Sequence, residues 1–354
     1  MGGPASHAPE VADFLRSRGH AVDAVITADA PPADTGYPVR WISRSLPVGI
    51  RHAWGARLVA ARARHADVVY TTGMSGRSTL GAALARTPFV LKLTADPAFE
   101  RALRLGLWRG SLEEFQRTRT VRTAPLRAAR NADMRAAAHL VTPSAYLRDL
   151  ALGWGVRPDR VTVLPNPAPR PPTLRPRDEL RSEFGFAGPT LVFAGRLVPQ
   201  KALELGIEAA HGAGVPLVIA GDGPEREVLE RLGHARFLGS LPRMRVLELF
   251  RAGDASLLSS SWENFPHTVV EALAVGTPVI ATRTGGVAEV VRDGENGLLV
   301  DPGDVDALRI AIERFAADAE LAAKLRANAA ASVASLAPEN VYGRLEQILL
   351  RVAA

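Results

Sequence analysis

Four charged residues in the second half of the chain have the types and the spacing to bind a phosphorylated ligand. Arg196 and Lys201 follow an apolar run that ends in Gly195, and Glu263 and Glu271 stand eight residues apart. A guanidinium forks onto phosphate oxygens, and an ammonium adds a compact positive charge. Lysine is informative here, because only three of the 43 basic residues are lysines. The alternative interpretation of the two cations is a solvated surface pair.

The two glutamates allow other chemistry. Paired carboxylates also hydrolyse glycosidic bonds, but such acids flank the scissile bond, whereas here a phosphate-binding pair lies nearby. Glu271 falls on a predicted helix, where an acid can instead serve the positive end of the helix dipole.

Two short apolar runs, 255–258 and 279–281, enclose the glutamates and predict buried strands. The segment between them predicts a loop and a helix, so the unit belongs to a parallel α/β sheet. Glu263 then lies in the loop at a strand's carboxyl end, and Glu271 lies on the helix that follows. Ligands bind at that edge of an open α/β sheet.

The same alternation extends over the whole chain. The other expected strands are 21–27, 39–42, 67–70, 89–93, 140–142, 161–164, 190–194, 216–220, 235–238 and 297–300. Helices are expected in the first half at 11–18, 53–64, 78–85, 112–137 and 145–152, and a long helical tail from Asp304.

Length and composition fit a globular chain of two domains. The chain has no cysteine, which excludes disulfides and thiolate sites and fits a reducing cytosol. Residues 1–170 hold 24 basic and 13 acidic residues, whereas residues 171–354 hold 19 and 24. The basic first half, with nine arginines between 101 and 135, favours an anionic or membrane-associated acceptor. An ordinary solvated helical face is the equal alternative.

Six prolines between Pro165 and Pro176 mark the domain boundary. We expect an N-terminal domain at 1–168, a proline-rich linker at 169–188 and a second domain at 189–336. The helix expected at 337–354 packs back on the N-terminal domain.

Several motifs stand in a fixed order in the second half: Ala194-Gly195-Arg196-Leu197 with Lys201, Gly221-Asp222-Gly223-Pro224, the two glutamates, Gly285-Gly286-Val287-Ala288-Glu289, and Gly294 to Asp304. Together they resemble the nucleotide-sugar-binding domain of the retaining glycosyltransferases of family four. The first half is similar only in outline, at 18–22 and 142–144. The resemblance implies the GT-B fold, in which two doubly wound, Rossmann-like parallel α/β domains face each other across a cleft.

By this resemblance, Arg196 and Lys201 hold the donor diphosphate and stabilise the leaving nucleotide. Glu263 faces the hydroxyls of the donor sugar, and Glu271 bonds to the ribose. The other implied donor-binding residues are Gly2, Gly3, Gly195, Gly221, Gly223, Leu241, Asn264 and Phe265. Asp96 stands near the place where many relatives have a histidine, and it could accept hydrogen bonds from the donor sugar or the acceptor. The equal alternative for Asp96 is a helix cap ahead of Pro97.

The start of the chain departs from the family pattern. Relatives begin with a buried strand before a Gly-Gly loop, whereas only Met1 precedes Gly2-Gly3 here. We therefore expect the N-terminal sheet to lack its usual first strand, with a gap between the strands at 21–27 and 67–70. Gly2-Gly3 would lie near the cleft, and a true start farther upstream is the simplest explanation.

The expected function is a retaining glycosyltransferase that moves a hexose from a nucleotide-diphosphate sugar to a hydroxyl of a glycan, glycolipid or small molecule, in cell-envelope glycan biosynthesis. The alternative is a degenerate sugar-nucleotide-binding subunit of a glycan-assembly system. We expect no metal, since Arg196 and Lys201 supply positive charge and no Asp-x-Asp pair stands near them. We also expect no other cofactor, and no nucleic-acid partner, because aromatic and basic residues are not interleaved. We expect a cytoplasmic location, with peripheral contact at an anionic inner membrane face as an option.

Overall fold

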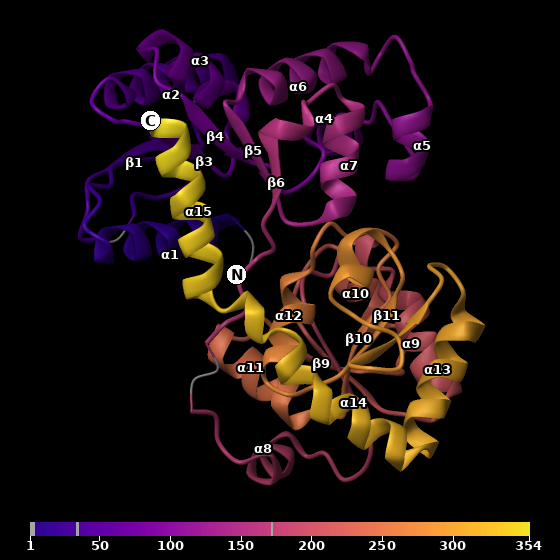
Figure 1. Cartoon of the computed structure of the whole chain (residues 1–354). Helices are drawn as coiled ribbons and strands as arrows, with labels where there is room; N and C mark the ends of the chain where they lie inside the picture. The colour runs from indigo at the N-terminus through magenta and orange to yellow at the C-terminus, as the bar shows by residue number, and fades with distance from the viewer. Residues whose placement is uncertain (1–3, 33–34, 171–172) are drawn as a thin grey trace. The chain divides into compact units, whose positions relative to one another are not determined.

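The structure is a computed structural model that describes residues 4–32, 35–170 and 173–354. The chain forms two compact units. Pro165–Val341 make up the C-terminal unit, and the chain up to Leu164 together with Tyr342–Ala354 makes up the N-terminal unit. In both units parallel strands alternate with helices (Figure 1), which confirms the predicted α/β class.

A six-stranded parallel sheet forms the centre of the C-terminal unit, in the order β12-β11-β10-β7-β8-β9. Its strands are β7 (Leu191–Ala194), β8 (Leu217–Ala220), β9 (Arg236–Gly239), β10 (Ala255–Leu258), β11 (Val279–Thr282) and β12 (Gly297–Val300). The chain moves outward from β7 to β9 and then returns to β10, which pairs with β7 on its other side. The sheet therefore reverses its strand order between β7 and β10.

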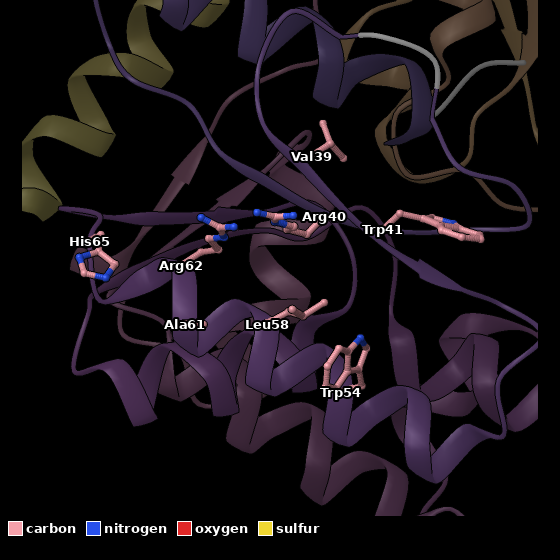
Figure 2. Close-up of a pocket in the computed structure, with 8 residues that line it drawn as sticks. All are labelled: Val39, Arg40, Trp41, Trp54, Leu58, Ala61, Arg62 and His65. Atoms are coloured by element: carbon pink, nitrogen blue, oxygen red, sulfur yellow. The ribbon is translucent and has the colours of Figure 1, made fainter.

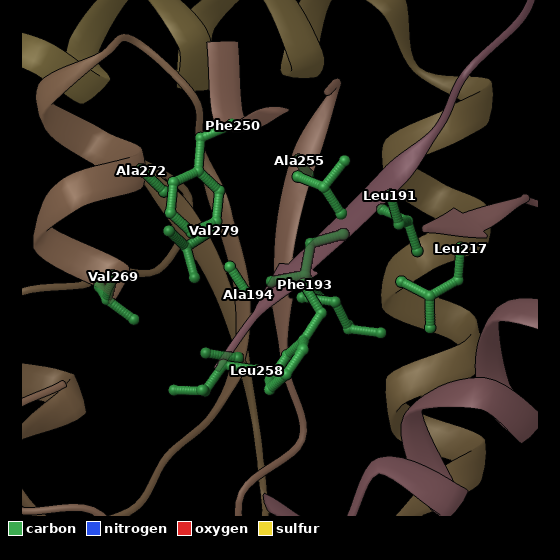
Figure 3. Packing of buried hydrophobic residues seen from close by; sticks show 14 of the residues in the cluster. Leu191, Phe193, Ala194, Leu217, Phe250, Ala255, Leu258, Val269, Ala272 and Val279 are labelled. Carbon is green, nitrogen blue, oxygen red and sulfur yellow. The ribbon is translucent and has the colours of Figure 1, made fainter. Parts of the chain in front are cut away.

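Helices cover both faces of this sheet, and this explains why its strands are continuous apolar runs. They are α9 (Leu203–Gly212), α10 (Arg226–Glu230), α11 (Arg243–Ala252), α12 (His267–Ala274), α13 (Val305–Ala317) and α14 (Ala319–Ser332). Figure 3 shows Phe193 and Leu258 of the sheet with Phe250 of α11 and Val269 of α12 in one buried cluster. The expected helical tail is divided, because Asp318 ends α13 and caps α14.

The prediction of a linker at 169–188 is partly wrong, because the second half of this segment folds into the C-terminal unit. α8 (Arg177–Phe184) begins directly after Pro176 and buries Leu180 completely. Arg181 of this helix pairs with Asp254 at 2.8 Å. The prolines end at the N-cap of α8, where proline does not disturb a helix. The proline-rich segment drew the prediction toward a linker, although Leu180 and Phe184 after it have the spacing of a helix face.

The strands of the N-terminal unit form two separate parallel sheets, β1-β2 and β3-β4-β5-β6. The strands are β1 (Ala24–Ala28), β2 (Val39–Ser43), β3 (Val69–Thr71), β4 (Phe89–Lys92), β5 (His139–Thr142) and β6 (Val161–Val163). Within the described residues no strand joins β1 to β3. The division falls where the sequence led us to expect a gap.

The helices of the N-terminal unit are α1 (Pro4–Ser17), α2 (Val48–Ala63), α3 (Ser75–Ala85), α4 (Pro97–Arg104), α5 (Leu112–Arg117), α6 (Ala124–Ala136) and α7 (Ala145–Gly153). The prediction of a single helix at 112–137 is also wrong, since residues 118–123 interrupt it. Arg127 of α6 donates to the carbonyls of Phe115 and Thr118, so one guanidinium satisfies backbone acceptors at the end of α5.

The last helix, α15 (Pro338–Ala353), belongs to the N-terminal unit from Tyr342 onward. Tyr342 is buried against Phe14 of α1 and donates to Glu10 at 2.7 Å. Glu346 lies 2.7 Å from His20 and 3.4 Å from Arg18. The C-terminal helix thus packs on α1, as expected for residues 337–354.

Candidate functional site

The site lies in the C-terminal unit, at the carboxyl ends of β7 and β10. The strand order reverses between these two neighbours, and ligands of open α/β sheets bind at such a reversal. The segment after β7 carries Gly195, Arg196 and Lys201, and the segment after β10 carries Glu263. The sequence therefore placed its cations and one glutamate at the correct edge.

Lys201 and Glu263 form an ion pair between these two segments. The two side chains are 13% and 8% exposed, so the pair is almost withdrawn from water. Ser260 donates to the same carboxylate oxygen of Glu263 at 2.9 Å. The Lys201 carbonyl accepts from Ser259 at 3.0 Å. Backbone and side chain of Lys201 are therefore both held by the segment after β10.

The backbone turns sharply after the lysine. Ala202, the first residue after the short 3-10 turn Pro199–Lys201, has a φ of 43°. A left-handed alanine costs about 1–2 kcal/mol. This strained residue also stands at the N-cap of α9. Lys201, the residue before this strained position, points its ammonium toward Glu263.

Further hydrogen bonds join the loops after β7, β10 and β11. Ser261 donates its backbone N–H to the carbonyl of Gln200 at 2.9 Å, and the side chain of Gln200 donates to the carbonyl of Trp262 at 2.9 Å. Thr282 and Thr284 donate to carbonyls of Ser260 and Ser261 at 2.6 and 3.2 Å. These tethers rigidify the edge on which the charged pair stands. The serine run after the strand at 255–258 was their signal in the sequence.

Arg196 differs from Lys201 in its surroundings. Its side chain is exposed, and no acidic group among the described residues forms an ion pair with it. It therefore leaves a guanidinium available to an incoming anion beside a cation that is already paired. The sequence had treated both residues alike, and their contact with a donor diphosphate stays a prediction.

The expected donor glycines Gly195, Gly221 and Gly223 lie where two loops cross. A Cβ on Gly221 would stand 1.8 Å from the Gly195 carbonyl oxygen, and one on Gly223 would stand 2.2 Å from that of Leu197. Leu197 in turn donates its N–H to Asp222 at 2.9 Å. The glycine requirement thus has a sufficient cause inside the protein, and contact of these glycines with a ligand stays a prediction.

Glu271 lies on α12, beyond the first turn, which contains no acidic residue. The helix-dipole alternative for Glu271 is therefore wrong. Its side chain, 14% exposed, faces Arg243 of α11 at 3.5 Å. Phe265 is buried next to the start of α12, while Asn264 and Leu241 are half-buried. A role for these residues with a ribose or a base stays a prediction.

Asp96 serves its own unit. Its carboxylate caps α4 by accepting from the N–H of Ala98 at 2.8 Å, and it also accepts from Gln116 at 2.8 Å and Arg130 at 2.6 Å. The side chain is 0% exposed. The capping alternative therefore describes this structure, and the geometry does not support the catalytic role expected for Asp96. Gly2 and Gly3 lie outside the described residues.

Lys92 is a second buried cation that the sequence analysis left without a role. Its Nζ lies 2.9 Å from Nε2 of His7, and each residue is 5% exposed. Burial lowers the pKa of Lys92 to about 7, because desolvation disfavours the ammonium form. The scarcity of lysine was the only signal in the sequence.

Two sequence families match the chain over these units. The family described as glycosyl transferases group 1 matches residues 176–332, and the glycosyl transferase 4-like domain matches residues 2–167. The chain therefore combines a glycosyl transferase 4-like domain with a domain of the glycosyl transferases group 1 family. Its two Rossmann-like units have the GT-B fold that the motifs predicted.

Several glycosyltransferases are similar to part of this chain. The lipopolysaccharide core biosynthesis glycosyltransferase LpsE of Rhizobium meliloti is 39% identical over 156 residues, which are 42% of this chain and 45% of LpsE. The D-inositol 3-phosphate glycosyltransferase of Acidothermus cellulolyticus is 33% identical over 201 residues, 49% of this chain and 44% of the relative. The matches thus span about half the length of these relatives.

The fold extends over the whole chain in solved structures. Anabaena Alr3699/HepE, crystallised in complex with UDP-glucose, superposes with a TM-score of 0.79 and 22% identity, and covers 99% of this chain and 96% of its own. In the described part of this chain, no helix has the length and apolarity to cross a bilayer. Nor does that part contain a group of three or more potential metal-ligating side chains.

Proposed function

We propose that the chain transfers a hexose from a nucleotide-diphosphate sugar to an acceptor hydroxyl, with retention of the anomeric configuration, in the cytoplasm. The observation that carries this proposal is the edge formed by Arg196, Lys201 and Glu263. It combines an exposed guanidinium, a fixed ammonium and a buried carboxylate at the reversal of the strand order. The names of LpsE and of the complex with UDP-glucose support a sugar nucleotide as donor.

Each residue of this edge has a distinct task. Arg196 donates to the phosphate oxygens, whose charge grows as the sugar–phosphate bond breaks. Lys201 adds positive charge from a position that Glu263 fixes, without a side-chain search when the donor arrives. Glu263 accepts hydrogen bonds from sugar hydroxyls with the oxygen that Lys201 and Ser260 leave available. Glu271 accepts from the ribose hydroxyls.

Retention follows in this proposal from the role of the leaving group. The departing phosphate stays on the face of the sugar that it leaves, where it helps to remove the proton of the attacking hydroxyl. Arg196 and Lys201 stabilise the negative charge that the phosphate acquires, so we propose no metal or other cofactor. Product analysis by NMR of the new anomeric centre tests retention, and an inverted product would refute it.

A second candidate is a subunit that binds the sugar nucleotide without turnover. The observation that favours it is Asp96, which is fully engaged in the N-terminal unit and offers no group to a reaction. The two candidates share donor binding and differ only in nucleotide release.

A donor screen tests both. We expect one of UDP-, GDP- and ADP-glucose to raise the melting temperature of the chain, because a ligand that binds only the folded state stabilises it. Nucleotide release in the presence of acceptor or water supports the transferase. Saturable binding without release supports the subunit, and no thermal shift with any sugar nucleotide contradicts both.

The acceptor and its location form a separate part of the proposal. Among the nine arginines at 101–135, Arg130 is buried against Asp96, and Arg127 packs over Phe115 at 3.8 Å from the ring centroid. These two arginines serve the unit itself. The basic charge of residues 1–170, to which the other seven arginines contribute, is the ground on which we propose an anionic acceptor of the glycan or glycolipid type. Binding to anionic vesicles that is lost at high salt would add peripheral membrane contact. Equal binding to neutral vesicles would exclude an electrostatic contact.

A further inference from the structure

The N-terminal unit contains a cavity of about 630 Å³ that no step of the proposed reaction uses. This volume is within the ~300–1,000 Å³ range of ordinary ligand sites. The cavity lies between β2 and the second half of α2, and Figure 2 shows its lining. The lining residues are Val39, Arg40, Trp41, Trp54, Leu58, Ala61, Arg62 and His65.

The cavity is distinct from the donor edge, which belongs to the C-terminal unit. β2 pairs only with β1, so its other backbone edge carries no strand among the described residues. α2 packs beside this edge, and the cavity runs along both elements rather than over the carboxyl ends of the strands. Its position therefore gives no reason to assign it to the sugar nucleotide.

The charge around the cavity is of one sign. Residues 35–66 contain six arginines, two histidines and no acidic residue. The only carboxylate paired with a lining residue, within the described chain, is Asp23, which lies 3.2 Å from Arg62. Arg40 is exposed and has no acidic partner in that part of the chain. The cavity thus has an unneutralised guanidinium, and an anion fits it better than a neutral or cationic ligand.

The other chemistry of the cavity is aromatic. Trp54 is 47% exposed although it is one of the largest apolar side chains of α2. Trp41 donates its indole N–H to the carbonyl of Ala28 at 3.0 Å, which fixes the ring on the strand. In the view of Figure 2, His65 and Arg62 lie toward the left, Arg40 lies near the middle, and Trp54 and Trp41 lie to the right of it. A ligand here meets cations at one end and indole rings at the other.

We propose that this cavity binds an anionic saccharide, with a carboxylate or phosphate group on Arg40 and Arg62 and a sugar ring against Trp54. The C–H face of a pyranose is apolar and packs on an aromatic ring, while its edge keeps its hydroxyls in water. A guanidinium fork matches the planar carboxylate of a uronic acid. The identification of this saccharide with an acceptor chain rests on the proposed function, but its binding does not.

Calorimetric titration without any sugar nucleotide tests the site. The probes are tetragalacturonate, neutral maltotetraose and inorganic phosphate. We expect tetragalacturonate to bind at least ~10-fold more tightly than the other two, since a charge-assisted hydrogen bond and ring stacking are both present only in that ligand. Arg40→Ala and Trp54→Ala should each weaken its binding at least ~10-fold, and Trp54→Phe should restore most of the loss.

Arg57→Ala is the matched control for Arg40→Ala, because Arg57 is an exposed arginine of α2 that does not line the cavity. It removes the same charge and should leave affinity within about twofold. Equal effects of Arg40→Ala and Arg57→Ala would overturn the proposal in favour of general attraction to a basic surface. Binding of phosphate as tight as that of tetragalacturonate would overturn the saccharide part. Vesicle binding that requires Trp54, without saccharide binding, would assign the surface to a membrane instead.

The experiment separates this proposal from the proposed function. A chain that binds tetragalacturonate but no sugar nucleotide supports the cavity and contradicts the transferase. A chain that releases nucleotide but shows no Arg40-dependent saccharide binding supports the transferase and overturns the cavity. Melting temperatures of Arg40→Ala and Trp54→Ala show whether these variants remain folded, which we expect because both side chains are exposed.

Discussion

The two units of the chain build their ligand-facing edges in different ways. In the C-terminal unit one continuous sheet carries the edge, and loops tied to one another hold the Lys201–Glu263 ion pair at the carboxyl ends of the strands. In the N-terminal unit the strands are split between two sheets, and the Arg130–Asp96 ion pair is buried inside the unit. The comparison teaches that the same α/β class can place its charges either for ligands or for its own cohesion.

The buried apolar clusters show the same contrast. In the C-terminal unit one cluster extends from Ala168 to Val333, through every layer of the sheet and its helices. In the N-terminal unit the cluster extends from Ala82 to Val156 and includes no residue of β1 or β2. The apolar cluster of the N-terminal unit is therefore the smaller of the two.

The largest expected effect is on the N-terminal unit. Asp96→Ala leaves Arg130 buried without its carboxylate and removes the cap of α4. We expect the free energy of unfolding of this unit to fall by ~3–5 kcal/mol, the usual cost of removing one partner of a buried pair. Calorimetry should show the loss as a shift of one thermal transition.

Asp149→Ala is the control for Asp96, because Asp149 forms an ion pair with Arg148 and is 62% exposed. It should change stability by less than ~1 kcal/mol. If both variants unfold alike, the N-terminal unit does not depend on its buried pair. If instead Asp96→Ala retains its melting temperature and loses turnover, the catalytic interpretation of Asp96 returns.

The second effect belongs to the C-terminal edge. Lys201→Ala should lower kcat/KM more than ~100-fold, the scale for loss of one preorganised electrostatic donor. The substitution also leaves the buried carboxylate of Glu263 without its cation, which can destabilise the fold. A double variant is therefore needed to separate the effect on the reaction from the effect on folding. Lys201→Met/Glu263→Gln should recover the melting temperature but not the rate. Lys324→Ala, which changes an exposed lysine of α14, should alter neither, and recovery of the rate in the double variant would contradict a role for Lys201 with the donor.

A third effect should appear in the pH dependence of stability. Burial lowers the pKa of Lys92 from 10.5 to about 7, so between these values the unfolded chain binds the proton that the folded chain has released. Stability should therefore rise as pH increases from about 7 toward 10, by at most ~1.4 kcal/mol per pH unit. Below pH 7 both states hold the proton, and the cost of burying the ammonium is fully present.

Urea titrations at pH 7, 8 and 9 measure this slope. Lys92→Met should flatten it, because the substitution keeps the length of the side chain and removes its titration. Lys324→Met should retain the slope of the parent chain. An unchanged slope in Lys92→Met would show that another group titrates in this range.

The smallest expected effect concerns the ribose contact. Glu271→Ala should weaken binding of the sugar nucleotide about 10-fold, through loss of hydrogen bonds to a charged group. Arg243→Ala removes the partner of Glu271 and tests whether the ion pair alone matters. Equal losses in both variants would show that Glu271 acts through Arg243 and not on the donor.

The sequence predicted the C-terminal edge well because its information is local. The serine run, Glu263 and the segment of Lys201 each follow a short apolar strand, and parallel strands bring their carboxyl ends together. The strands themselves were predictable for the same reason, since an apolar run between turn residues is a local signal.

The remainder depends on contacts between distant residues. Asp96 looked equally fit for a cap and for catalysis. Its contacts with Gln116, 20 residues away, and with Arg130, 34 residues away, engage the carboxylate within the unit. The helix expected at 112–137 breaks because Arg127 reaches back to α5, which no periodicity records. The cavity beside β2 joins residues of a strand edge and a helix, and its shape has no counterpart in either segment alone.

The position of α15 has a consequence for folding during synthesis on the ribosome. The chain leaves the N-terminal unit at Leu164 and returns to it at Tyr342. Synthesis proceeds at ~5–20 residues per second, so the whole C-terminal unit emerges while α1 still lacks the helix that covers Phe14 and His7. The N-terminal unit is therefore synthesised first but completed last. Until α15 emerges, the face of α1 that carries Phe14 is exposed to nascent-chain chaperones.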